Sequence, residues 1–457
     1  MNNEEYISSL LNKAYAAQSV YANFNQEQVD QIVKAVGRIA FDYAEKMAIM
    51  AVEETGFGRV DSKTFKIQRS MAATWHYLKD KKSMGLIDVD EENALLTYAK
   101  PAGVAACICP STNPSSTVFQ NGMSILKGKN AMIVAPHPKA FQSTKIAVDL
   151  IRQVLREHNA PEDIVQMIES PSYELVQLLM KKVDVVAATG GPGMVAAAYS
   201  SGTPSYGVGA GNMQVIMVED YNEFDKAATF ISNNRFYDNA ITCTSEQFVF
   251  IPEKNQKAML DAFKTAGAFL VEDEEVKDKI RQLLFKEDGN LNPASVGMPA
   301  ITLAAEIGLD VPEDTKFLLL KAKGVGKTDV LCREKLCPVT AYVTYNDFDE
   351  AIAGAVANLE LIGKGHSAVI YTYNDELVRK AGEALPVCRL LVNQSGSASS
   401  GGGLMNGLNP TISLGCGFWG RNSISENLIY KHFLNITQVA YVKKGATPPD
   451  YLALWND

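Results

Sequence analysis

The sequence predicts an α/β protein built from two doubly wound halves, each surrounding a mostly parallel sheet. Two observations favour this class. Short apolar runs of strand length alternate with longer segments whose apolar residues recur at helical spacing, a pattern typical of parallel sheets covered on both faces. The chain also has 457 residues, 47% of them hydrophobic, which is more than one hydrophobic core usually accommodates. We therefore expect two intertwined domains.

The first hundred residues are expected to be helical up to a hairpin. Apolar residues at positions 29, 32, 36, 39 and 40 follow helical spacing and predict an amphipathic helix pair over residues 23–54. A second helical stretch is expected over residues 63–80. Acidic residues at 90–92 and Asn93 then separate two short extended runs, 85–89 and 95–99, as in a β-hairpin.

After Pro101 the sequence alternates between strands and helices in two series. In the first we expect strands at 104–109, 131–135, 183–188 and 214–218, with helices at 116–126, 141–157, 172–181, 193–200 and 222–234. In the second we expect strands at 247–251, 317–321, 340–345, 368–373 and 389–392, with helices between them. The two series meet near Asp238, which places Cys243 at the junction of the domains, where small-molecule sites usually lie.

The composition excludes several broad classes of function. A net charge of −9 without a local run of Lys and Arg argues against a general nucleic-acid or anionic-membrane binder. The apolar stretches are too short to span a bilayer, and the first eleven residues lack a secretory pattern, so we expect a cytoplasmic protein. The seven cysteines are scattered and odd in number, which favours reduced thiols. Cys107 and Cys109 have no further ligands nearby, and we expect no metal site.

Cys243 is the first candidate for chemistry. It lies where a helix should end and a strand should begin, and its neighbours include Thr, Ser, Asn and Glu. A structural cysteine usually lies inside an apolar run, as Cys107 does. A thiol among polar side chains is partly accessible, which suits a nucleophile. The alternative is an inert thiol.

Three other features follow or precede strands and are ambiguous when each is taken alone. Asn113 follows a strand, and its amide could donate a hydrogen bond to an oxyanion, although a simple turn asparagine is the alternative. Residues 189–193 (TGGPG) precede a helix, where glycines let phosphates approach backbone N–H groups, but they do not form the usual dinucleotide fingerprint. His366 opens a strand and is either structural or, near an active cysteine, a general base.

Together these features resemble the aldehyde dehydrogenase superfamily, and within it the CoA-acylating branch. The resemblance covers about residues 23–441, and its most specific segments are 207–212 (GVGAGN), 236–247 (FYDNAITCTSEQ) and 414–427 (LGCGFWGRNSISEN). It implies two Rossmann-like doubly wound domains with an oligomerisation arm. The implied divisions are a dinucleotide-binding domain over 1–238 with a hairpin at about 85–100, a catalytic domain over 239–431, and an oligomerisation strand and tail over 432–457.

The resemblance also implies roles for the matched residues. Cys243 would be the nucleophile, Asn113 and the Cys243 backbone N–H would form the oxyanion hole, and His366 matches a histidine suspected of helping thiol chemistry. The residues implied to lie against NAD or NADP are Pro136, His137, Thr189, Gly190, Gly191, Gly209 and Glu334, the last on the nicotinamide-side ribose. CoA would be the co-substrate, and the subunits would form a homodimer or homotetramer.

One departure from the wider superfamily discriminates between reactions. Hydrolytic members carry a glutamate that activates the deacylating water, whereas this sequence has Val208 or Gly209 at the corresponding place. Without that base, attack of water on a Cys243 thioester should be slow, and a thiol is the more plausible acceptor. We therefore expect acyl-CoA formation, with a hydrolytic dehydrogenase or a catalytically silent scaffold as alternatives.

The substrate is expected to be a short aldehyde with an anionic end. Arg235 lies eight positions before Cys243 and could pair with a carboxylate or sulfonate, unless it is a solvated cation at a helix end. Ser111, Ser245 and Ser397 add hydrogen-bonding groups. This polar set is most similar to CoA-dependent succinate-semialdehyde dehydrogenases, followed by acylating sulfoacetaldehyde and then acetaldehyde or propionaldehyde enzymes. The sequence does not discriminate NAD from NADP.

Overall fold

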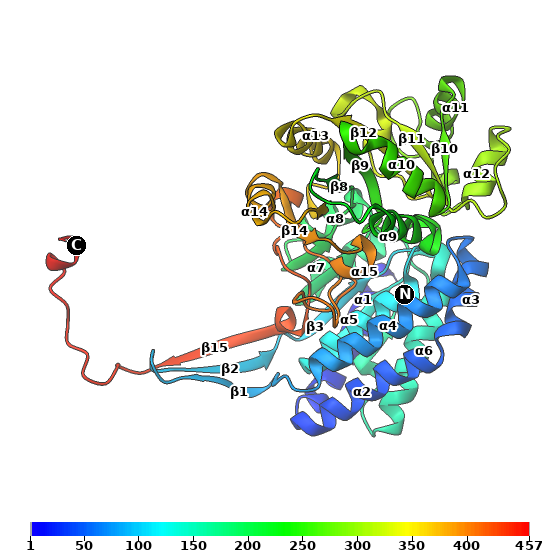
Figure 1. The fold of residues 1–457 in the computed structure, drawn as a ribbon. Helices are drawn as coiled ribbons and strands as arrows, with labels where there is room; N and C mark the ends of the chain where they lie inside the picture. Colours follow the sequence, from blue (N-terminus) through cyan, green and yellow to red (C-terminus); the bar gives the residue numbers. More distant parts are fainter. Residues whose placement is uncertain (1, 457) are drawn as a thin grey trace.

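The computed structural model describes residues 2–456, which form two parallel sheets and a projecting antiparallel arm (Figure 1). The first sheet contains, in spatial order, β5 (Val165–Met167), β4 (Ala131–Ala135), β3 (Val104–Ile108), β6 (Val185–Thr189) and β7 (Ser205–Val208). The second contains β10 (Ala268–Val271), β11 (Phe317–Lys321), β12 (Val339–Tyr345), β9 (Glu246–Pro252), β8 (Met213–Met217), β13 (Gly365–Tyr371) and β14 (Val387–Val392). The predicted α/β class is confirmed.

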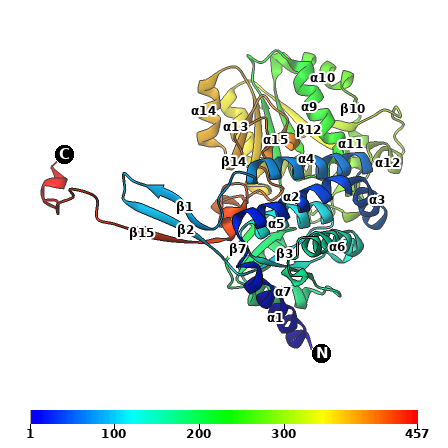
Figure 2. The same cartoon turned by 90° about the horizontal axis from the view of Figure 1, so that it is seen from below.

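Helices pack around both sheets. Those of the first half are α1 (Asn3–Tyr21), α2 (Gln26–Asp42), α3 (Ala44–Thr55), α4 (Val60–Leu78), α5 (Pro114–Lys127), α6 (Phe141–Glu157), α7 (Tyr173–Lys182) and α8 (Pro192–Tyr199). Those of the second half are α9 (Phe224–Phe236), α10 (Gln256–Thr265), α11 (Glu274–Leu284), α12 (Ala300–Glu306), α13 (Phe348–Leu361), α14 (Asp375–Ala384) and α15 (Gly396–Ser400). Figure 2 shows α4 along the boundary between the two halves.

The central strands are apolar on both faces because helices cover both sides of each sheet. Every residue of β3, β4 and β8 is buried. Along β9, Phe248 and Phe250 belong to one apolar cluster, whereas Val249 and Ile251 belong to the other. The period of two along the strand thus divides the second core into two layers. This burial gives a rigid frame for the loops at the ends of the strands.

One buried helix fixes the position of a predicted site residue. All residues of α5 from Pro114 to Lys127 are buried, and Lys127 pairs with Asp30 of α2. Asn113 is the N-cap residue of α5, but its side chain makes no capping hydrogen bond, and Pro114 at the first helical position needs no N–H partner. The Asn113 amide is therefore held at a fixed point while remaining available for other contacts.

The predicted hairpin and the C-terminal strand form a three-stranded arm that leaves the body of the molecule (Figure 1). β1 (Gly85–Asp90), β2 (Leu95–Pro101) and β15 (Leu434–Ala440) pair antiparallel, with β2 in the centre. The hairpin expected at 85–99 is confirmed, and β15 lies within the segment 432–457 in which the resemblance implied a strand.

Two expectations about the arrangement need correction. The strand expected at 214–218 in the first series is β8, which pairs with β9 and β13 in the second sheet. The chain therefore passes between the sheets after Val208 and before Met213, not near residue 238. A short apolar run is compatible with a buried strand in either sheet, so its sequence alone does not reveal which sheet the strand joins. The short strands β5, β7 and β10 and the helix α1 were not predicted.

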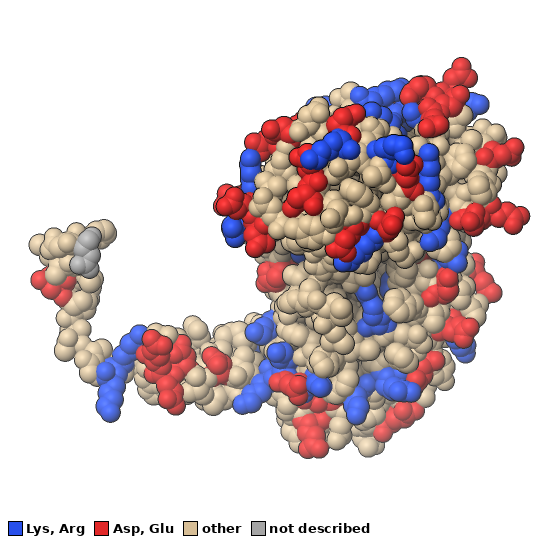
Figure 3. Space-filling view, viewed as in Figure 1, with Lys and Arg blue, Asp and Glu red and all other residues tan. Residues whose placement is uncertain are grey.

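The face shown in Figure 3 carries charges of both signs. Acidic and basic side chains are interspersed over the face that Figure 3 shows, both on the body and along the arm. Within residues 2–456, no helix combines the length and apolar composition needed to cross a membrane.

Candidate active site

A cavity of about 530 Å³ lies where the two halves meet, and Cys243 and Asn113 both line it. Its wall is built from α4, the start of α5, the loop before β9, α15 and the glycine-containing loop that follows α15. The polar or charged residues among those lining it are Lys66, Arg69, Ser70, Asn113, Gln120, Asn233, Asn234, Tyr237, Thr242, Cys243, Thr244, Ser397, Ser399, Asn406 and Thr411. The sequence therefore identified two residues that the fold brings into one pocket from positions 130 apart.

The loop that carries Cys243 has an unusual backbone. Asp238, Asn239 and Ala240 are three consecutive non-glycine residues with positive φ, at 53°, 50° and 58°. Such conformations are uncommon outside glycine and persist where surrounding contacts enforce them. The contacts are present: the Arg59 backbone N–H donates to Asp238 Oδ1 at 2.9 Å, and Asn239 Nδ2 donates to the Gly297 carbonyl at 2.8 Å. The nucleophile loop is thereby fastened to the start of α4.

Cys243 lines this cavity. The residue is partly buried, and burial of the sulfur raises its pKa to about 12, with Glu334 and Cys416 adding to the effect. The thiol form therefore dominates near neutral pH. Accessibility of Cys243 agrees with the expectation from its polar neighbours, but the thiol is not pre-ionised in this state.

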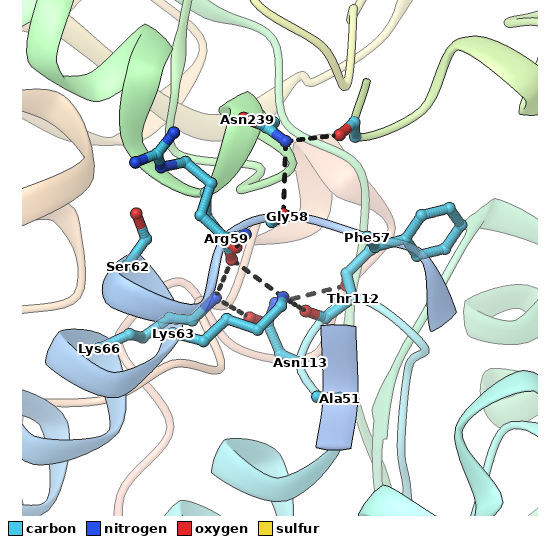
Figure 4. Close-up of polar contacts among 12 residues, drawn as sticks. Ala51, Phe57, Gly58, Arg59, Ser62, Lys63, Lys66, Thr112, Asn113 and Asn239 are labelled. Carbon is cyan, nitrogen blue, oxygen red and sulfur yellow. Dashed lines mark hydrogen bonds and ion pairs between the residues drawn. The ribbon is translucent and has the colours of Figure 1, made fainter. Parts of the chain in front are cut away.

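Asn113 is held by a charged network (Figure 4). Lys66 Nζ donates to Asn113 Oδ1 and, at 2.6 Å, to Asp238 Oδ2. Lys63 Nζ donates to the Thr112 carbonyl at 3.1 Å and to Asp238 Oδ2 at 3.2 Å. Asn113 Nδ2 donates one hydrogen bond, to the Oγ1 atom of the adjacent Thr112 at 3.3 Å. The network thus joins α4, the start of α5 and the nucleophile loop.

The residues expected against the dinucleotide gather at one edge of the first sheet. Thr189 ends β6, Pro136 and His137 follow β4, and Gly209 follows β7. These strands are parallel, so their carboxyl ends face the same side, where open α/β sheets bind ligands. Gly190 and Gly191 precede α8, and a Cβ atom built on Gly191 or Gly193 meets no atom within 4 Å. Open space therefore lies before the N-terminus of α8, as phosphate binding requires.

Glu334 links this edge to the nucleophile. Its buried carboxyl group accepts a hydrogen bond from the Gly211 backbone N–H at 3.1 Å through Oε1, and burial raises its pKa to about 8. Its other oxygen makes no hydrogen bond to residues 2–456, which leaves it free for a ribose hydroxyl. Gly211 in turn lies against the backbone carbonyl of Cys243. The open glycine turn and the free carboxyl oxygen fit an NAD(P) molecule that reaches Cys243 from the first sheet.

His366 does not line the cavity. It is fully buried at the start of β13, with Nδ1 3.1 Å from Ser367 Oγ and with no partner for Nε2 among the described residues. Burial, assisted by Arg389, lowers the pKa of the His366 imidazole to about 3. The ring is therefore neutral at physiological pH and a weak base. This geometry favours the structural interpretation of His366 over the catalytic one.

The substrate contacts expected from the sequence are partly wrong. Arg235 is fully buried behind the site, where its guanidinium donates to Ser245 Oγ at 3.1 Å and to the carbonyls of Lys335, Cys337 and Val339. The Ser245 hydroxyl is occupied by this hydrogen bond from Arg235. Arg235 lies in the last turn of α9, and its guanidinium reaches the first residue of β12, Val339. Ser111 also lies outside the lining, whereas Ser397 is part of it.

The cations that do reach the cavity are Lys66 and Arg69 of α4, which the sequence interpretation missed. They are three residues apart and therefore share one helix face. Phe65, Ala72 and Ala73 line the cavity beside them. A pair of cations on an otherwise apolar helix face was the available signal, but nothing in the sequence places α4 against Cys243.

Comparison with known proteins identifies the class. A family model described as "Aldehyde dehydrogenase family" matches residues 1–279. The succinate-semialdehyde dehydrogenase (acetylating) of Clostridium kluyveri is 47% identical over 456 residues, covering 100% of both chains. The sulfoacetaldehyde dehydrogenase of an Acholeplasma species is 40% identical, covering 97% of this chain and 92% of the relative. The crystal structure of an acetylating aldehyde dehydrogenase from Geobacillus thermoglucosidasius has a TM-score of 0.92 and 34% identity, covering 98% of each chain.

The chain belongs to the aldehyde dehydrogenase family. Within the family it groups with the acylating enzymes, as the resemblance of the sequence indicated. Two similar solved structures show what such enzymes bind: an engineered glycolyl-CoA reductase holds NADP+, and a propionaldehyde dehydrogenase of Rhodopseudomonas palustris holds CoA beside an acylated cysteine. They share 27% and 26% identity with this chain, each with a TM-score of 0.86. Each of the two matches covers 96% of this chain and 97% of the chain in the solved structure.

Proposed function

We propose that the protein is an NAD(P)-dependent, CoA-acylating aldehyde dehydrogenase that works through a thioester on Cys243. The observation that carries this proposal is the chemistry of the cavity wall. Among the described residues that line it, none is Asp, Glu or His, so the wall offers an attacking water no carboxylate or imidazole base. A thioester formed there reacts slowly with water and faster with a more nucleophilic thiol.

Cys243 and Asn113 carry the first half-reaction. Cys243 releases its thiol proton to solvent, the thiolate adds to the aldehyde carbon, and the carbonyl oxygen becomes an alkoxide next to Asn113 Nδ2 and the Cys243 backbone N–H. Two such donors stabilise the developing charge, and losing one costs about 3 kcal/mol of transition-state stabilisation. Bound NAD(P)+ supplies the acceptor for the hydride that leaves the former aldehyde carbon. Cys243 then carries the acyl group as a thioester.

The second half-reaction returns Cys243 to its starting state. The sulfur of CoA bonds to the acyl carbon, the bond from that carbon to Cys243 Sγ breaks, and the CoA thiol proton passes to the departing Cys243 sulfur. Asn113 stabilises the tetrahedral oxyanion a second time, so one donor serves both halves. In the reverse direction the same groups reduce an acyl-CoA to an aldehyde. His366 is assigned no proton transfer here because it lies outside the cavity and its pKa is low.

The substrate proposal is succinate semialdehyde. Arg69 places positive charge on the cavity wall, and Arg pairs well with a carboxylate. The relative from Clostridium kluyveri, which matches over the whole chain, bears the name of this substrate. Sulfoacetaldehyde also has an anionic end and is the second candidate, whereas acetaldehyde and propionaldehyde have no anionic group for Arg69 to bind.

The subunits are proposed to form a homodimer through the arm, with a homotetramer as the larger alternative. The arm exposes Leu86, Val89 and Ile436, which are 40%, 51% and 51% accessible. Apolar side chains on a sheet of only three strands need a partner to be buried. Sedimentation of the intact protein gives the number of subunits, and a Val89→Lys variant should shift it toward monomer.

The test of the reaction follows reduced nicotinamide with succinate semialdehyde and NAD+ or NADP+, with and without CoA. We expect sustained turnover only with CoA, and none from Cys243→Ala. Equal sustained turnover without CoA would show that water resolves the thioester and that the enzyme is hydrolytic. The choice between the two nicotinamides follows from the same assay.

A further inference from the structure

We propose that Lys66 is a positioning residue of the oxyanion site, which fixes the orientation of the Asn113 amide and holds a positive charge beside it. The inference rests on the proposed function, because it concerns the donor that stabilises the alkoxide. It assigns a role to α4, a helix that contributes no residue to the sequence motifs. Figure 4 shows the arrangement, with Lys66 and Lys63 reaching from α4 toward Asn113 and Thr112.

The first step of the argument is the amide orientation. An ammonium group donates hydrogen bonds and cannot accept them, so the atom of Asn113 that faces Lys66 Nζ must be the carbonyl oxygen Oδ1. Nδ2 is then directed away from Lys66, and its one recorded contact is the long one to Thr112 Oγ1 at 3.3 Å. An N–H of Asn113 remains available to an alkoxide in the cavity. Without Lys66, no charged group would choose between the two amide orientations.

The second step is the charge. Asp238 Oδ2 binds both lysines, at 3.2 Å from Lys63 Nζ and 2.6 Å from Lys66 Nζ. Burial alone would raise the pKa of Asp238, but Lys66 and Lys63 outweigh it and hold that pKa below its usual value. Burial and the neighbouring Lys66 lower the pKa of Lys63 to about 8, so it remains mostly protonated at neutral pH. Two cations and one anion leave one net positive charge beside the oxyanion donor.

The third step is rigidity. Lys66 is mostly buried, with 11% of its side chain exposed, and Asp238 is fully buried. Asp238 is further held by the Arg59 backbone N–H, in the segment of positive φ that precedes Cys243. The same carboxylate therefore positions Lys66 and anchors the nucleophile loop. A preorganised donor of this kind contributes to catalysis because it does not reorganise as the charge develops.

The test compares Lys66→Met with the wild type in a single turnover without CoA, where the burst of reduced nicotinamide reports the first half-reaction. Removing a hydrogen bond to a charged group should slow the burst by about 10- to 100-fold. We expect the same loss with succinate semialdehyde and with butanal, a neutral aldehyde of the same length, and little change in the KM of either. Lys145→Met, an exposed ion-paired lysine of α6, serves as the matched control and should leave the burst unchanged.

Double-mutant analysis separates positioning from other roles. In an Asn113→Ala background, Lys66→Met should slow the burst by less than about threefold, because the group it positions is gone. An undiminished loss in that background would overturn the inference. So would a loss confined to the KM of succinate semialdehyde, which would make Lys66 a contact of the substrate carboxylate. Lys66→Gln, whose amide can both donate and accept, replaces Lys66→Met if the latter does not fold.

The outcomes also separate this inference from the proposed function. A wild-type enzyme with a CoA-dependent reaction and an Asn113→Ala defect, but an unaffected Lys66→Met, would keep the function and refute the positioning role. A wild-type enzyme without aldehyde turnover would remove the reaction and the inference with it.

Discussion

Gly211→Ala should disable the enzyme while leaving its fold largely intact. A Cβ atom on Gly211 would lie 1.9 Å from the Cys243 carbonyl oxygen and 2.7 Å from its carbonyl carbon. Ordinary contact begins at about 3.4 Å, so the two backbone segments must separate by about 1.5 Å. Both atoms belong to the backbone, and no side chain can rotate away. The nucleophile would move relative to Asn113, and a 1 Å misplacement costs about 100-fold in rate.

The measurement for Gly211→Ala is the rate of acyl-CoA formation together with the thermal midpoint. We expect the rate constant to fall about 100-fold or more, with a free energy of unfolding lowered by about 1–3 kcal/mol, as for overpacked cores. Gly382→Ala is the matched control: it lies in α14, and its Cβ meets no atom within 4 Å. The control should keep full activity and equal or greater stability. A Gly211→Ala enzyme with wild-type rate would refute the packing of residue 211 against the nucleophile loop.

Three further predictions follow from burial and charge. The rate of Cys243 alkylation by iodoacetamide in the ligand-free enzyme should rise about tenfold per pH unit between about pH 7 and 10. The reason is that a thiol pKa near 12 makes the thiolate the minor form throughout this range. A rate that reaches a plateau below pH 8 would contradict this. Arg235→Met should lower the free energy of unfolding by about 3 kcal/mol or more in denaturant titrations, because the substitution leaves buried carbonyl groups without hydrogen-bond donors. An unchanged denaturation midpoint together with a raised KM would instead show that Arg235 contacts the substrate. Arg69→Met should raise the KM for succinate semialdehyde roughly fivefold while leaving that for butanal unchanged, and equal effects on both aldehydes would argue against carboxylate recognition.

The fold was largely predictable because its signals are local. Short apolar runs, such as β4 and the first four residues of β11, can be recognised from the sequence alone, and α6 has the bounds that helical periodicity gives. The pairing of β8 was not predictable, since partners in a parallel sheet are chosen by long-range packing. Three residues, as in β5, are too few to show a period.

The site divides in the same way. Cys243 was recognisable because its neighbours are polar, and Asn113 because it follows a strand at the carboxyl edge of the sheet. Arg235 was misassigned because distance along the chain from Cys243 says nothing about which way a helix side chain points. Lys66 and Arg69 were missed because they act through the docking of α4, a contact between segments about 170 residues apart, as in the ion pair of Lys66 with Asp238.

Intact-protein mass after mixing the enzyme with succinate semialdehyde and the oxidised nicotinamide, without CoA, tests the Cys243 thioester most directly. We expect one succinyl group per subunit on the wild type, stable for longer than a catalytic turnover, absent from Cys243→Ala and removed when CoA is added. A wild-type protein that turns over without ever carrying the adduct, or an adduct that survives in Cys243→Ala, would contradict covalent catalysis at Cys243.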